Sequence, residues 1–203
     1  MEHGVGICPV DSFTRPSFVI YLSLFFLLVC INSLGAKYFV FSYPIVTGVS
    51  SFYLIVAFMI VFALWFGIWG ILAAYVGCVI GAGILSGLPA DVSLSWSFAD
   101  LWQALIPYVA FRYFHADPAL STRRDLMIFL IFGVMINNIA GAVWGSYTLA
   151  YGGIIETSQI MMTLIGWFLV NLAVCGILAP FILITVTPWM KTQELYMGNR
   201  WNN

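Results

Sequence analysis

Three asparagines near the middle of long uncharged stretches of the chain are candidates for chemistry. Asn137 and Asn138 are near the middle of the apolar run 126–150, and Asn171 is near the middle of the run 158–186. A buried amide costs free energy unless it finds a hydrogen-bond partner, so such side chains either link two helices or line a ligand cavity. Because neighbouring residues of a helix point about 100° apart, Asn137 and Asn138 could serve both purposes.

Acidic and aromatic side chains form a second group of candidates. Asp91, Trp96, Asp100, Trp102 and Glu156 fall close to one predicted end of the apolar runs. Carboxylates attract cations, and tryptophan rings bind cations over their faces. Together with the three asparagines, these residues predict a site for a cationic or aromatic small molecule.

Asp100 also has a structural interpretation. Ser97 precedes it by three residues, and a serine followed at this distance by an acidic residue is typical of a capping box at a helix start. We therefore expect Ser97 to cap a helix and Asp100 to satisfy backbone donors in its first turn. A cap at the mouth of a cavity can still contact a ligand.

Residue patterns typical of catalysis or metal binding are missing from the sequence. His3 and His115 flank the apolar runs, and no HExxH, nucleophile-elbow or Walker pattern occurs. The cysteines have no repeated spacing, which predicts neither a disulfide framework nor a metal centre. We therefore expect no enzymatic activity, no cofactor and no bound metal. The four cysteines are Cys8, Cys30, Cys78 and Cys175.

Composition indicates which kind of fold must position these side chains. Of the 203 residues, 63% are hydrophobic and 7% are charged, whereas about 25% are charged in an ordinary soluble domain. So few charges cannot cover a soluble surface. The seven basic and eight acidic residues also provide no basic cluster to neutralise the phosphates of a nucleic acid. The sequence therefore predicts an integral membrane protein that contacts lipid and binds no nucleic acid.

Uncharged intervals long enough for membrane-spanning helices, about 20 residues each, predict six spans. The first follows Arg15 and has the length of a full span, so we interpret it as an uncleaved helix and not as a signal peptide. The interval from Lys37 to Asp91 accommodates two spans with a tight turn at Trp65–Trp69. We predict an all-α membrane domain over residues 1–203, with spans at 17–36, 49–65, 67–87, 97–114, 126–150 and 158–186.

Basic residues set the expected orientation of this bundle. With six spans, six of the seven lysines and arginines fall on the side of the two termini, and only Lys37 falls on the other side. Loops on the cytoplasmic side are enriched in Lys and Arg. Both termini are therefore predicted to be cytoplasmic, in a multi-pass protein of the cell membrane.

Small residues repeat at helical spacing in the third and fifth predicted spans. Such stripes let helix backbones approach closely, which is how helices associate in lipid. We expect these stripes to pack helices inside the bundle, and the alternative is a docking face for another membrane subunit. The residues are Gly70, Ala73, Ala74, Gly77 and Gly81 in the third span and Gly141 and Gly145 in the fifth.

A six-span chain with cytoplasmic termini and no soluble domain resembles the substrate-binding S component of an energy-coupling-factor transporter. The stretch Gly77–Gly81, followed by an external loop, resembles the arrangement of span and loop in that family. The resemblance implies capture of a vitamin or metal ion outside the cell and docking on a membrane coupling subunit with two ATPases. Because the first span has no AxxxA motif, the small residues of the third span are the expected partner surface.

A second resemblance covers roughly residues 65–188. Three segments are similar to the membrane-associated sensor domains that precede histidine kinases and diguanylate cyclases. This resemblance implies a sensor module that works with a separate signalling partner. The segments are WFGIWGILAAYVGCVIGAGILSGLP, RRDLMIFLIFGVMINNIAGAVWGSYTLAYGG and GWFLVNLAVCGILAPFILITVTP.

These observations together predict a small-molecule-binding membrane protein. We expect it to act as the substrate-capture component of a multi-subunit transporter. The alternatives are a sensor module for a signalling partner and an accessory structural subunit of a membrane complex. The expected ligand contacts are Asp91, Trp96, Asp100, Trp102, Asn137, Asn138, Glu156 and Asn171.

Overall fold

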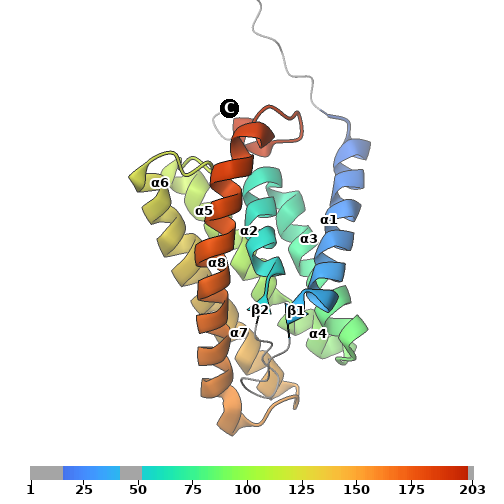
Figure 1. Ribbon diagram of the computed structural model, residues 1–203. Helices are drawn as coiled ribbons and strands as arrows, with labels where there is room; N and C mark the ends of the chain where they lie inside the picture. The colour runs from blue at the N-terminus through green and yellow to red at the C-terminus, as the bar shows by residue number, and fades with distance from the viewer. Residues whose placement is uncertain (1–15, 42–51, 201–203) are drawn as a thin grey trace, which may run out of the picture.

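The computed structural model describes residues 16–41 and 52–200, and nearly all of them are helical (Figure 1). The predicted all-α architecture is confirmed for these residues, apart from a short antiparallel ribbon in which β1 (Val40–Phe41) pairs with β2 (Phe52–Tyr53). The start of the predicted span 49–65 and the tail with His3 and Cys8 lie outside the described residues. The helices are α1 (Phe18–Tyr38), α2 (Ile55–Phe66), α3 (Ile68–Cys78), α4 (Ala90–Trp96), α5 (Phe98–Phe114), α6 (Arg123–Ile128), α7 (Asn137–Tyr151) and α8 (Ile160–Met190).

Short π-helical and 3-10 segments extend several of these helices. The π-helical stretch Val79–Gly83 continues α3, and the π-helical stretch Phe129–Ile136 joins α6 to α7. Three 3-10 turns complete the described chain, at Ile84–Ser86, Thr157–Gln159 and Met197–Arg200.

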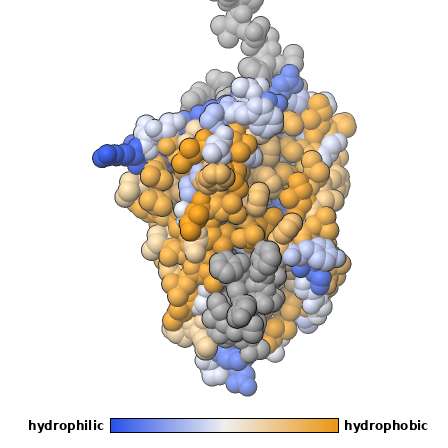
Figure 2. Space-filling view, viewed as in Figure 1, coloured by the Kyte–Doolittle hydropathy of each residue, from blue (hydrophilic) through white to orange (hydrophobic). Residues whose placement is uncertain are grey.

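Four helices of the described chain are long and apolar enough to cross a membrane. They cover Phe18–Tyr38, Ile68–Ser86, Arg123–Tyr151 and Thr157–Met190. Large hydrophobic side chains remain exposed along them, and the face seen in Figure 2 is apolar between hydrophilic ends. A surface of this kind is expected where helices face lipid, because a soluble protein rarely exposes so large an apolar area.

Helix α2 is shorter because it occupies the centre of the bundle. It has 12 residues, and nearly all of its side chains are buried against α3, α5 and α8. A helix that is hydrophobic on every side is stable only when it is surrounded by other elements. Its core contacts include the ring of Phe111 in α5 and the side chain of Leu183 in α8, both completely buried.

The turn between α2 and α3 is made by a glycine. Gly67 has φ of 59° and ψ of −131° and separates the end of α2 at Phe66 from the start of α3 at Ile68. Glycine adopts such positive φ values at low cost. The turn therefore lies inside the predicted segment Trp65–Trp69.

The predicted small-residue stripes lie at contacts within the bundle. A Cβ added at Gly77 would overlap Asn32 of α1, and one added at Gly81 would overlap the Ser33 carbonyl oxygen of α1. Gly70 is equally close to the backbone of Phe62 in α2. The α3 stripe is thus covered by α1 and α2, so the partner surface predicted there is not exposed. Ala73, Ala74, Gly141 and Gly145 are buried as well.

The chain ends of the described bundle lie together. In Figure 1 the start of α1 and the end of α8 are at the same end, and the α5–α6 connection is there too. The end of α7 and the start of α8 are at the opposite end. The helices therefore run back and forth along one common direction.

The close approach of α1 and α3 leads to a stability prediction. Gly81→Ala should lower the thermal stability of the purified protein by about 1–3 kcal/mol, because backbone atoms must move to admit the new methyl group. The measurement is thermal unfolding in one detergent. Gly176→Ala is the matched control, since a Cβ there would have only Val134 Cγ1 nearby, at 3.8 Å. Equal melting temperatures for the two variants would contradict this packing.

Candidate functional site

The asparagines at the start of α7 meet a glutamine from α5. Gln103 Nε2 donates a hydrogen bond of 2.6 Å to Asn138 Oδ1, and Asn137 Nδ2 donates one of 3.3 Å to the Gln103 carbonyl oxygen. Asn138 Nδ2 donates to the Val134 carbonyl oxygen one turn earlier. All three amide side chains are completely buried. Hydrogen bonds between buried amides thus fix the position of α5 relative to α7.

The backbone around these residues allows the close contact. A Cβ at Gly141 would lie only 2.6 Å from Gln103 Cδ, so glycine leaves the room that the glutamine occupies. The π-helical stretch Phe129–Ile136 ends directly before Asn137. The first two residues after this eight-residue stretch are both buried amides.

Helix α8 adds side chains from successive turns to the same contact. Cys175 Sγ lies 4.0 Å from Asn138 Oδ1. Two turns earlier, the Trp167 ring occupies the space beside Gly145 of α7. Asn171 lies one helical turn from each of them and is 1% exposed. It therefore lies on the face of α8 that contacts α7.

Trp96, the last residue of α4, completes the group. Its ring lies beside the Trp167 ring, with 5.6 Å between the centroids and 60° between the planes. We call this group the polar seam, because its polar atoms lie between helices whose outer faces are apolar. The polar seam comprises Trp96, Gln103, Asn137, Asn138, Trp167, Asn171 and Cys175.

Four buried atoms of the polar seam have no hydrogen-bond partner among the described residues. Trp96 Nε1 and Asn171 Nδ2 are donors, and Gln103 Oε1 and Asn137 Oδ1 are acceptors. Leaving a buried polar atom unpaired costs about 1–3 kcal/mol, and folded proteins leave few of them. The polar seam therefore lacks partners for two donors and for two acceptors.

Asp100 neither caps α5 nor belongs to the polar seam. Ser97 has helical backbone angles, φ −65° and ψ −13°, and its hydroxyl donates to the Ser93 carbonyl oxygen instead of accepting a cap bond. The predicted capping box is wrong because the chain enters α5 directly from another helix. The buried Asp100 carboxylate accepts a hydrogen bond of 2.9 Å from the Tyr53 hydroxyl, on the side of α5 that faces β2.

The other expected ligand contacts lie elsewhere. Asp91 in the first turn of α4 and Glu156 before α8 are exposed, and Glu156 forms a capping box with Gln159. Trp102 packs edge-on against Trp144, with 6.3 Å between ring centroids. The structure thus places Asn137 and Asn138 against Gln103 and Trp96 against Trp167. The acidic residues lie outside these contacts.

Three residues of the polar seam were missed in the sequence. Gln103 is a polar residue inside an apolar run, which is the same signal that identified the asparagines. Trp167 and Cys175 lie four residues on either side of Asn171, so helical spacing indicates their common face. Only the contact with Asn138 identifies Cys175 as part of a polar group.

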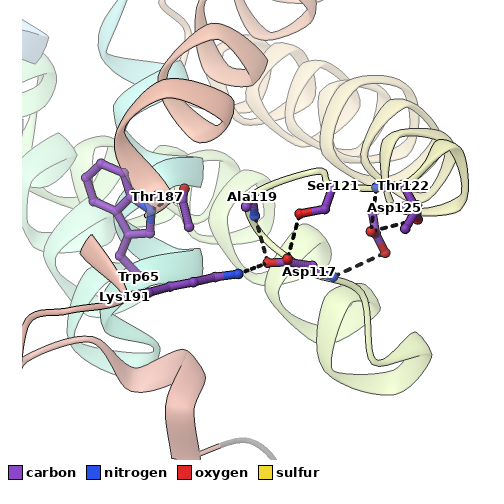
Figure 3. Close-up of polar contacts among 8 residues, drawn as sticks. All are labelled: Trp65, Asp117, Ala119, Ser121, Thr122, Asp125, Thr187 and Lys191. Carbon is purple, nitrogen blue, oxygen red and sulfur yellow. Dashed lines mark hydrogen bonds and ion pairs between the residues drawn. The ribbon is translucent and has the colours of Figure 1, made fainter. Parts of the chain in front are cut away.

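A second polar cluster joins the α5–α6 connection to the start of α6 (Figure 3). Thr122 and Asp125 form a capping box, in which Thr122 Oγ1 accepts from the Asp125 N–H and Asp125 Oδ2 accepts from the Thr122 N–H. Asp125 Oδ1 also accepts from the Asp117 N–H at 3.2 Å. Asp117 accepts hydrogen bonds from the Ala119 N–H and the Ser121 hydroxyl. The connection is therefore ordered by its two aspartates.

The same cluster holds the end of α8. Lys191 Nζ forms an ion pair of 2.6 Å with Asp117 Oδ1, and Thr187 Oγ1 accepts from Trp65 Nε1 of α2 at 3.0 Å. Partial burial raises the pKa of Asp117, but the bonds from Lys191, the Ala119 backbone and Ser121 outweigh it and lower the pKa overall. Asp117 is therefore ionised at neutral pH. Such a partly exposed ion pair contributes at most about 1 kcal/mol.

No protein-family model matches the chain, and neither a curated protein nor a solved structure matches it. Its chemistry must therefore be inferred from its own residues. Within residues 16–41 and 52–200, no three His, Cys, Asp or Glu side chains lie close enough together to hold a metal ion. The polar seam offers hydrogen bonds and aromatic surface, which are the means of non-covalent recognition.

The amide pair of the polar seam can be tested by a double-mutant cycle. Gln103→Leu and Asn138→Leu should each destabilise the protein by about 1–3 kcal/mol, because each leaves a buried partner unpaired. The double variant should cost less than the sum, since both partners of the bond are then removed. Thermal unfolding of the four proteins in one detergent measures the coupling. Strictly additive losses would contradict a direct Gln103–Asn138 bond.

The Asp117–Lys191 pair predicts a dependence on pH. An aspartate has an unfolded pKa of about 3.9, and the folded pKa of Asp117 is lowered. The pair therefore stabilises the protein above the unfolded value, and this contribution is lost as the pH falls through the lowered pKa. Lys191→Met should raise the pKa of Asp117, as measured by carboxyl NMR titration. Arg123→Met is the control and should leave it unchanged, whereas an unaltered Asp117 titration in Lys191→Met would exclude the pair.

Proposed function

We propose that this protein is a six-span protein of the cell membrane that binds a small molecule and serves as the substrate-capture component of a multi-subunit transporter. The observation that carries the proposal is the polar seam. This group has seven side chains from α4, α5, α7 and α8, and four of their buried polar atoms lack partners among the described residues. A bound molecule supplies the missing hydrogen bonds.

The proposed six spans include two crossings in addition to the four candidate membrane-spanning helices. Helices α4 and α5 follow one another over residues 90–114, which gives them the combined length of a span. Helix α2 is enclosed by protein, and elements inside a membrane bundle need not match the bilayer thickness by themselves. These two features support crossings by α4–α5 and by α2.

The arrangement of the basic residues supports cytoplasmic termini. Arg112, Arg123 and Arg124 are exposed beside the α5–α6 connection, and Lys191 is bonded to that connection. Figure 1 places this connection at the same end as the start of α1 and the end of α8. Basic residues concentrated at one end favour the cytoplasmic side for that end.

One observation favours the sensor module as a second candidate. Helix α8 carries Asn171 of the polar seam and, with Pro180 and Pro188 inside it, extends to Met190, next to Lys191, which is held by Asp117. A displacement of α8 by a ligand is therefore carried to the basic end, where a cytoplasmic signalling partner would act. The capture component remains the first proposal because binding alone is sufficient for it.

Native mass spectrometry of the gently solubilised protein tests ligand capture. We expect a discrete non-lipid adduct that survives moderate collision energy and co-purifies with the native protein. Asn171→Ala should reduce the adduct by about tenfold, because a loss of about 1.4 kcal/mol corresponds to that factor. Co-purified membrane and ATPase subunits would favour transport, and a co-purified kinase would favour sensing.

Asn32→Ala is the matched control for this experiment. Asn32 is also a completely buried asparagine with one unpaired amide atom, but it lies in α1, and its Nδ2 donates to the Leu28 carbonyl oxygen. This variant should keep the adduct. A protein without any non-lipid adduct, or an adduct equally reduced in both variants, would contradict capture at the polar seam.

A further inference from the structure

We infer that the ligand of the polar seam is a small neutral solute that carries both hydrogen-bond donors and acceptors, such as a carboxamide or a urea. The inference rests on the proposed function and specifies its substrate class. It departs from the cationic ligand that the acidic residues of the sequence predict. Three properties of the polar seam support the inference. They are its unpaired hydrogen-bonding atoms, its lack of formal charge and its aromatic side chains.

The unpaired atoms define the hydrogen bonds that the ligand must make. Trp96 Nε1 and Asn171 Nδ2 require an acceptor, whereas Gln103 Oε1 and Asn137 Oδ1 require a donor. A carboxamide or urea carries a carbonyl acceptor next to N–H donors, so it offers both kinds of group that these atoms lack. An ammonium ion offers donors alone, and a carboxylate offers acceptors alone.

The charge of the polar seam favours neutral ligands over ionic ones. Its seven side chains carry no formal charge, and the Asp100 carboxyl, one turn before Gln103 in α5, already accepts a hydrogen bond from the Tyr53 hydroxyl. Asp91 and Glu156 are exposed outside the group. A buried ion without a counter-charge loses its hydration with no compensation. A neutral molecule does not incur that loss.

Two tryptophans add a selective surface to these hydrogen bonds. The rings of Trp96 and Trp167 contact one another, and Gly145 lets the Trp167 ring approach α7 closely. Ligand sites combine apolar aromatic walls with a few polar groups that fix the orientation of the ligand. A planar amide can pack against an aromatic ring and still use its polar edge for hydrogen bonds.

Saturation-transfer NMR on the purified protein tests the class of ligand with four probes. Acetamide and urea are neutral, choline is cationic and acetate is anionic. We expect saturation transfer to acetamide and urea, and none to choline or acetate. Asn171→Ala should weaken acetamide binding by about tenfold. Asn32→Ala should leave it unchanged, and Gln103→Met provides a second variant if Asn171→Ala does not fold.

The outcomes separate this inference from the proposed function. Binding of choline or acetate that is lost in Asn171→Ala would overturn the neutral class and leave ligand capture in place. If no probe binds, the formal charge of the adduct in native mass spectrometry decides: a neutral adduct supports the inference and a charged one overturns it. The absence of both probe binding and an adduct would refute capture and the inference together.

Discussion

The structure depends on one constraint: polar groups inside a bundle with an apolar exterior must be satisfied by the protein itself or by something bound to it. Lipid offers no hydrogen bonds, so each buried amide needs a partner from a neighbouring helix. Gln103 and Asn138 meet this demand for one another at 2.6 Å. Their bond fixes the register of α5 and α7, and Cys175 brings α8 to the same point. Eight buried side-chain atoms of the described residues stay unpaired, and four of them belong to the polar seam.

The helices could be predicted from the sequence because uncharged intervals between charged residues are long and clearly bounded. Helix α1 and the helical stretches over Arg123–Tyr151 and Thr157–Met190 lie close to their predicted limits. Helix α2 is shorter than predicted, because a helix enclosed by others is not constrained by bilayer thickness. The capping box at Ser97 failed for a related reason: the residue types alone do not reveal that α4 leads straight into α5.

The candidate site could be predicted only in part. Asn137, Asn138 and Asn171 were identified because amides are conspicuous in apolar runs, and all three are buried in the structure. Asn32 gives the same signal but lies in α1. The acidic residues and Trp102 were assigned to the same site because they share one end of the bundle, but sharing an end does not bring side chains into contact. Asp100 faces Tyr53 because of its position around α5, and that angular position depends on which helices become neighbours. Which side chains come into contact depends on how the helices pack, and that packing cannot be read from a single sequence.

Helix α8 connects the polar seam to the opposite polar cluster. From Asn171 to Lys191 it runs for about 30 Å, at 1.5 Å per residue, so the two sites are too far apart to touch. Pro180 and Pro188 lie between these two points of the helix. At the end of α8, Lys191 forms a partly exposed ion pair with Asp117, and such pairs contribute little to stability. Buried side chains therefore hold the middle of α8 against α7, whereas a weak surface interaction attaches its end.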